Sequence, residues 1–88
     1  MRIINNICLV CGYDQLEEPQ YVEEVPSYEI CSCCGFEAGF DDDAASYPQT
    51  IPEYRASWLK HDAPWFMLKE KPANWDLKEQ LKNINFEL

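Results

Sequence analysis

The sequence predicts a small α+β fold, in which two cysteine knuckles and a short antiparallel sheet pack against about two helices. Three observations predict it: a C-x-x-C-G motif that occurs twice, β-prone segments beside the second motif, and two amphipathic segments in the second half. With 88 residues the chain is expected to form one domain, residues 1–88. Residues 1–43 would be its cysteine part and residues 44–88 its helical, aromatic part.

The repeated motif is Cys8-Leu9-Val10-Cys11-Gly12 and then Cys31-Ser32-Cys33-Cys34-Gly35. In each copy a tight turn holds two thiols three positions apart, and the glycine that follows can adopt positive φ. Nineteen residues separate the two pairs, within the range typical of paired C-x-x-C zinc sites. Four thiolates close a tetrahedral structural site, so this part is expected to be a zinc ribbon. The predicted ligands of one structural zinc ion per chain are Cys8, Cys11, Cys31 and Cys34.

Disulfide bonds and free buried thiols are the competing interpretations of these cysteines. The apolar run at the N-terminus is short and is interrupted by Asn5 and Asn6, unlike a secretory leader or a membrane span. We therefore expect a cytoplasmic protein, and thiols in the cytoplasm stay reduced. Five cysteines is also an odd number, which a disulfide framework does not predict. Metal binding is the preferred interpretation.

Short strands are expected beside the knuckles. Residues 2–9 form a candidate strand that enters the first knuckle, and residues 21–25 are β-prone. Residues 27–30 alternate polar and apolar side chains up to the second knuckle, and Pro26 should mark an edge, a bend or a break. Residues 41–43 are three aspartates without the alternating pattern of a calcium loop, so they are expected to form a solvated loop with Asp43 near the start of a short turn.

Two helices are expected in the second half. Thr50 and Glu53 fit a capping box, which predicts a helix over residues 51–60. A second amphipathic pattern predicts a helix over residues 74–83, with Asn74 as its N-cap. The aromatic side chains here could form a core or a recognition surface, and the small size of the domain favours the core for most of them. They are Trp58, Trp65, Phe66 and Trp75.

Cys33 and His61 are the other reactive candidates. Cys33 could be a redox-active thiol beside the metal, or a small residue that fills space in the knuckle. His61 could be a metal ligand or a general base, but it has no nucleophile or orienting partner in its pattern. Its place at a predicted helix end favours contact with the last carbonyl groups. No catalytic motif is present, so an enzyme is not expected.

The charge of the chain indicates what kind of partner it has. Sixteen acidic residues stand against seven Lys and Arg, a formal net charge of −9, and four zinc-bound thiolates would add a further −2. Nucleic acids repel such a surface, because their binding requires cations that displace phosphate counterions. No membrane association is expected either. The expected partner is a protein, and a basic one fits this charge.

Residues 28–37 and the aspartates 41–43 resemble the small cysteine-rich CPCC-type bacterial proteins. These have two cysteine knuckles, the second preceded by Tyr-Glu-Ile and followed by an aromatic and acidic segment, as in Tyr28-Glu29-Ile30 and Phe36-Glu37 here. The resemblance implies a zinc-ribbon-like cytosolic protein of unassigned function, and some similar proteins are thought to lie beside bacterial toxin genes as candidate immunity proteins. The first knuckle here is Cys-Leu-Val-Cys, without the proline–cysteine pair of that type.

The leading functional hypothesis is a non-enzymatic protein-interaction module with a structural zinc site. An acidic inhibitor or immunity-type protein is its specific version. The alternative hypothesis is a thiol redox or zinc-responsive protein that uses Cys33 next to the metal site.

Overall fold

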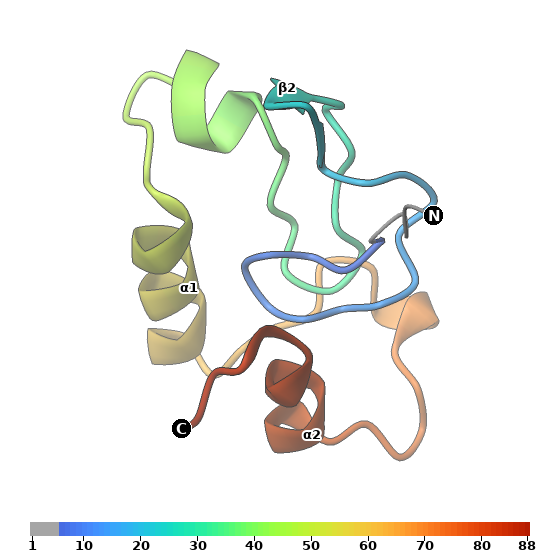
Figure 1. The fold of residues 1–88 in the computed structure, drawn as a ribbon. Helices are drawn as coiled ribbons and strands as arrows, with labels where there is room; N and C mark the ends of the chain where they lie inside the picture. Colours follow the sequence, from blue (N-terminus) through green and yellow to red (C-terminus); the bar gives the residue numbers. More distant parts are fainter. Residues whose placement is uncertain (1–5) are drawn as a thin grey trace.

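The knuckles occupy the middle of the molecule in the computed structural model, which describes residues 6–88 (Figure 1). Around them lie, in chain order, β1 (Tyr21–Val22), β2 (Val25–Pro26), a π-helical turn (Phe40–Ala44), α1 (Ile51–Lys60), a 3-10 turn (Leu68–Glu70), α2 (Leu77–Leu81) and a 3-10 turn (Lys82–Ile84). This arrangement confirms the predicted α+β fold. No helix of the described part is long and apolar enough to cross a membrane.

The sheet is one antiparallel hairpin of β1 and β2, with Tyr21 opposite Pro26. Glu23 and Glu24 make its two-residue turn, and their φ values are 51° and 70°. Positive φ at both positions gives the backbone twist that two-residue hairpins favour. Residues 21–25, expected as one β-prone segment, therefore fold back on themselves, and Pro26 lies at an edge where it need not donate a hydrogen bond.

Two other strand predictions are corrected. Residues 6–9 belong to no strand, and the remainder of the expected strand over residues 2–9 lies outside the described residues. The expected strand over residues 27–30 is reduced to one antiparallel bridge between Ile30 and Glu37. The reason is the knuckle itself, whose two flanks fold back on each other within a few residues and leave no length for a ladder.

The helix α1 has the predicted bounds. Thr50 Oγ1 accepts a hydrogen bond from the backbone N–H of Glu53, and Glu53 Oε1 accepts one from the N–H of Thr50, at 3.2 and 2.8 Å. His61 ends the helix, and its Nδ1 lies 2.8 Å from the carbonyl oxygen of Ser57. The predicted capping box and the contact of His61 with the last carbonyl groups are both confirmed.

The helix α2 is shorter than the sequence predicts. Its N-cap is Asp76 and not Asn74, and the Asp76 side chain accepts a hydrogen bond from the N–H of Glu79 at 3.2 Å. The chain then tightens into the 3-10 turn at Lys82–Ile84. Asp76 and Asn74 are both good caps, so composition alone did not distinguish them.

The aspartates over residues 41–43 lie in a short π-helical turn, in which Asp43 is exposed and Asp41 and Asp42 are half-buried. Asp41 Oδ2 accepts a hydrogen bond from the N–H of Glu37, and Asp42 Oδ1 accepts one from the N–H of Gly39, both at 2.7 Å. Carboxylates are favoured at the N-terminal end of a helical turn, where backbone donors lack partners. Two of the three aspartates therefore have a local structural role.

Most of the buried residues form one cluster, in which cysteine is the commonest residue. It contains Cys8, Val10, Cys11, Leu16, Cys31, Cys33, Cys34, Phe36, Ala38, Trp58, Ala63 and Trp65. The Trp65 ring lies between those of Tyr13 and Trp75 in edge-to-face contacts, with centroids 5.6 and 5.4 Å away. Most of the aromatic candidates thus belong to the core, as predicted, whereas Phe66 is 59% exposed.

We predict that Thr50→Ala destabilises the protein by about 1 kcal/mol, because the N–H of Glu53 loses its acceptor at the start of α1. Thr50→Ser should retain most of the stability, since its hydroxyl can accept the same hydrogen bond. Urea denaturation measures both. Ser46→Ala is the control, because Ser46 is exposed and should change the free energy of unfolding by less than about 0.5 kcal/mol. An equal loss for Thr50→Ala and Ser46→Ala would show that the cap contributes nothing.

Candidate metal centre

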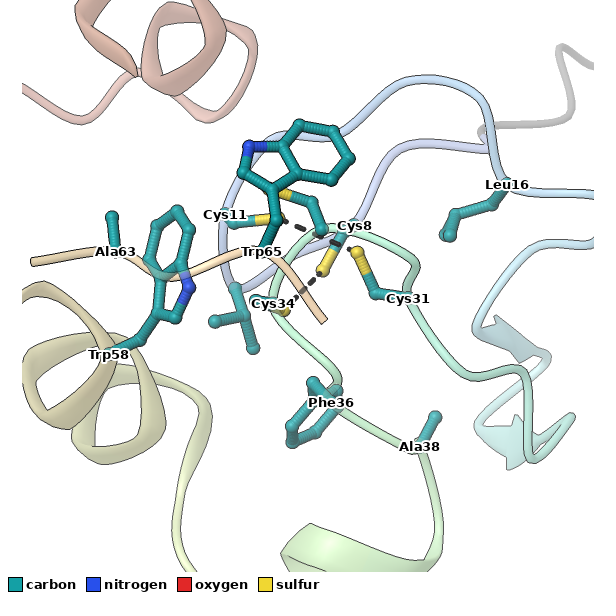
Figure 2. Packing of buried hydrophobic residues seen from close by; sticks show 12 residues of the cluster. Cys8, Cys11, Leu16, Cys31, Cys34, Phe36, Ala38, Trp58, Ala63 and Trp65 are labelled. Carbon is teal, nitrogen blue, oxygen red and sulfur yellow. Dashed lines mark hydrogen bonds between the residues drawn. The ribbon is translucent and has the colours of Figure 1, made fainter. Parts of the chain in front are cut away.

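The two knuckles face each other and bring four cysteine sulfurs together (Figure 2). We call them the four-sulfur group: the Sγ atoms of Cys8, Cys11, Cys31 and Cys34, all within 4.8 Å of one another and all buried. The sulfurs of Cys8 and Cys34 are 3.6 Å apart, and so are those of Cys11 and Cys31. Ligands about 2.3 Å from a tetrahedral ion have sulfurs about 3.8 Å apart. The group therefore has the size and the donor atoms to hold one thiophilic metal ion.

The same turn is built twice. In the first knuckle the N–H of Cys8 donates to the carbonyl of Tyr13 at 2.8 Å, and the N–H of Gly12 donates to the carbonyl of Cys8 at 2.9 Å. The second knuckle repeats both hydrogen bonds 23 positions later, at 3.1 and 2.9 Å. The φ angles of Gly12 and Gly35 are +86° and +82°, in the left-handed region that the turn requires.

Cys33 and His61 lie outside the four-sulfur group. Cys33 occupies in the second knuckle the position of Val10 in the first, and both side chains are fully buried. This equivalence favours the interpretation of Cys33 as a residue that fills space. Its sulfur accepts a hydrogen bond from Gln80 Nε2 at 3.3 Å. His61 is exposed at the C-terminal end of α1 and contributes no ligand atom to the group.

Three thiols of the four-sulfur group have pKa values shifted in different directions. Hydrogen bonds from the thiols of Cys11, Cys31 and Cys34 hold the pKa of Cys8 far below its usual range. Burial raises the pKa of Cys11, and it raises that of Cys34 as well. Four thiolates at these distances need a positive ion between them.

Gln20 contacts the four-sulfur group, although the sequence analysis did not single it out. It is 2% exposed, and its Nε2 donates to the sulfur of Cys8 at 3.3 Å. Its Oε1 accepts a hydrogen bond from the N–H of Leu9 at 2.8 Å, which fixes the amide in this orientation. Such a donor stabilises a thiolate and orients a metal ligand. A lone glutamine in an acidic loop gives no pattern from which this role could be predicted.

The first knuckle is held by polar side chains from the helical half. Four successive carbonyl groups, those of residues 9–12, accept hydrogen bonds from Arg55, Gln80 and Asn83 at 2.7–3.0 Å. Arg55 belongs to α1, and Gln80 belongs to α2. Trp75 Nε1 donates to the Gln80 side-chain oxygen at 2.8 Å and so orients its amide toward the knuckle.

The second knuckle is held mainly by backbone groups. The N–H groups of Phe66 and Met67 donate to the carbonyls of Cys33 and Ser32, at 2.9 and 2.8 Å. The hydroxyl of Tyr54 donates to the carbonyl of Cys34 at 3.3 Å. Burial raises the pKa of Tyr54 to about 12, so this hydroxyl stays protonated and remains a donor at neutral pH.

Fold and site together define a small α+β protein organised around a four-cysteine candidate metal centre. The chain is 35% identical to the uncharacterized protein YoaQ of Bacillus subtilis (strain 168) over 91 aligned positions, which cover 89% of this chain and 72% of YoaQ. The chain therefore belongs to the same family as YoaQ. No protein-family profile matches the chain, and no solved structure matches it.

We predict that Gly12→Ala destabilises the protein more than Gly35→Ala. Both positions have positive φ, which costs an L-residue about 1–2 kcal/mol. At Gly12 the new Cβ would also lie 2.3 Å from the backbone oxygen of Gln80, so α2 must move. At Gly35 it would lie 2.9 Å from a ring carbon of the exposed Phe66, which can rotate away. Urea denaturation of both variants measures the difference, and equal losses would contradict tight packing of α2 on the first knuckle.

Proposed function

We propose that this protein is a non-enzymatic protein-interaction module whose fold is held by one zinc ion. The observation that carries the proposal is the four-sulfur group, buried and of tetrahedral size. The ligands would be the thiolates of Cys8, Cys11, Cys31 and Cys34. Closed sets of four thiolates are typical of structural zinc, and such sites contribute roughly 10–16 kcal/mol of apparent binding free energy in small peptides.

A structural role follows from the donor set. When all four coordination positions are taken by thiolates, none is left for water or a substrate, whereas catalytic zinc keeps one open. Gln20 would stabilise the Cys8 ligand through its N–H group. Protons compete with the metal for the thiolates, so acidification should release it.

A protein partner is supported by the charge of the chain. The formal net charge of −9 would become more negative with a zinc tetrathiolate, which suits a basic protein and not a nucleic acid. The resemblance of residues 28–37 to the CPCC-type proteins points in the same direction, toward an acidic inhibitor or immunity-type protein. We therefore propose a cytoplasmic protein that binds a basic partner stoichiometrically.

A thiol redox or zinc-responsive role remains the alternative. One observation favours it, the hydrogen bond from Gln80 to the sulfur of Cys33, since such donors stabilise a thiolate. Full burial of Cys33 opposes it, because oxidants and thiol reagents need access to the sulfur.

We predict one zinc per chain by elemental analysis, and loss of cooperative thermal unfolding after chelation. Cys34→Ser should lose both the metal and the cooperative transition, because a serine hydroxyl is a poor zinc ligand. The matched control is Cys33→Ser, the same change at the neighbouring position, which should keep one zinc and lose less than about 2 kcal/mol. A metal-free protein with unchanged melting, or equal damage from both variants, would refute the proposed ligand set.

We also predict that the zinc-loaded protein has no fast-reacting thiol. Titration with an aromatic disulfide reagent should proceed slowly for all five cysteines, and chelation should make them react together. The physical reason is that all five side chains are buried and four of them would be bound to the metal. One rapidly modified thiol that maps to Cys33, with release of zinc, would favour the redox alternative instead.

A further inference from the structure

The excess negative charge is confined to the knuckle half of the chain. Residues 1–50 contain ten acidic side chains and a single basic one, Arg2, whereas residues 51–88 contain six of each sign. In the described part, residues 6–88, the one ion pair joins Lys82 to Glu79 in the second half. None of the ten acidic side chains in residues 1–50 therefore forms an ion pair with a described basic side chain.

Two of these acidic side chains, together with one from residues 51–88, line a groove of about 440 Å³ beside the second knuckle. Three glutamates line it: Glu17, Glu29 and Glu70. Their carboxylates come from segments far apart in the sequence, and Glu29 Oε2 is fixed by a hydrogen bond from the N–H of Glu17 at 3.0 Å. The groove also contains Lys69, which leaves an excess of two negative charges.

Apolar side chains line the same groove. Leu16, Ile30 and Met67 contribute to it, and Ile30 and Met67 are 45% and 37% exposed. Exposed apolar surface surrounded by unpaired charge of one sign is typical of a site that binds another macromolecule. The hydrogen bond from the N–H of Met67 to the carbonyl of Ser32 joins one wall of the groove to the knuckle.

We infer that this groove docks a basic segment of the partner protein, in which lysine or arginine side chains alternate with apolar ones. The inference rests on the proposed function and names the surface that carries it out. The cationic groups would pair with Glu17, Glu29 and Glu70, and the apolar side chains would contact Ile30 and Met67. Because the Met67 wall is hydrogen-bonded to the second knuckle, we expect the shape of the groove to depend on the folded knuckle.

The test uses the zinc-loaded full chain and a labelled twelve-residue peptide of alternating lysine and leucine. Fluorescence anisotropy gives the dissociation constant at low and at physiological salt. The triple variant Glu17→Gln/Glu29→Gln/Glu70→Gln should weaken binding about 10- to 100-fold at low salt, two- to fivefold for each carboxylate. The control Glu23→Gln/Glu24→Gln/Glu87→Gln changes the net charge equally outside the groove and should weaken it less than about threefold.

A second variant tests the apolar part of the groove. Met67→Gln keeps the length of the side chain and the backbone hydrogen bond to Ser32. This substitution should weaken binding of the lysine–leucine peptide several-fold and leave binding of a lysine–serine peptide of equal charge unchanged. Amide chemical-shift changes on binding should map to residues 13–17, 29–32 and 67–70.

The outcomes separate the docking surface from the proposed function. Two results would refute the groove as the docking site while a basic partner remains supported. One is equal weakening of binding by the two triple variants. The other is chemical-shift changes confined to the hairpin and the π-helical turn. If zinc-loaded wild-type protein binds neither peptide at low salt, the proposal of a basic partner fails together with the groove. Melting curves and zinc content of every variant show that a loss of binding does not reflect a loss of folding.

Discussion

The structure depends on holding four cysteine sulfurs within 4.8 Å of one another in the centre of a small chain. The other elements of the described residues are short: the strands have two residues each, α2 has five and α1 has ten. Such elements are marginal in water unless tertiary contacts stabilise them. The hairpin, the helices and the aromatic residues therefore take their positions from the knuckles, and the usual order, in which secondary structure brings a site together, is reversed here.

Placing so many turns in the core has an electrostatic consequence. Turns expose carbonyl and N–H groups that have no partner in a ladder, and burying them unpaired would cost free energy. Side chains of the helical half satisfy these groups, as Arg55 does for the carbonyls of Leu9 and Val10. Gln20 accepts a hydrogen bond from the N–H group of Leu9 in the first knuckle, and it also donates one to the Cys8 sulfur. The helical half is thus a polar support for the knuckles as well as an apolar cover.

The features that the sequence predicts well are the local ones. The four candidate ligands follow from spacing within each knuckle, and the bounds of α1 follow from its capping box. The hairpin turn could not be predicted, because Glu23-Glu24 lacks the glycine or asparagine that usually marks positive φ. The role of Gln80 was also hidden, since its amide contacts Cys11, 69 positions away. Contacts of this kind depend on packing, which leaves no periodic pattern in the chain.

The two knuckles have the same internal geometry but different external supports, and this gives them different tolerance to substitution. The carbonyls of the second knuckle receive backbone N–H groups from residues 66 and 67, which any amino acid except proline can supply. The first knuckle relies on the side chains of Arg55, Gln80 and Asn83, each with a specific shape and donor. Substitutions at residues 66 and 67 should therefore leave the hydrogen bonds to the second knuckle intact. Around the first knuckle, a substitution of any of these three side chains would leave a backbone carbonyl without its hydrogen-bond donor.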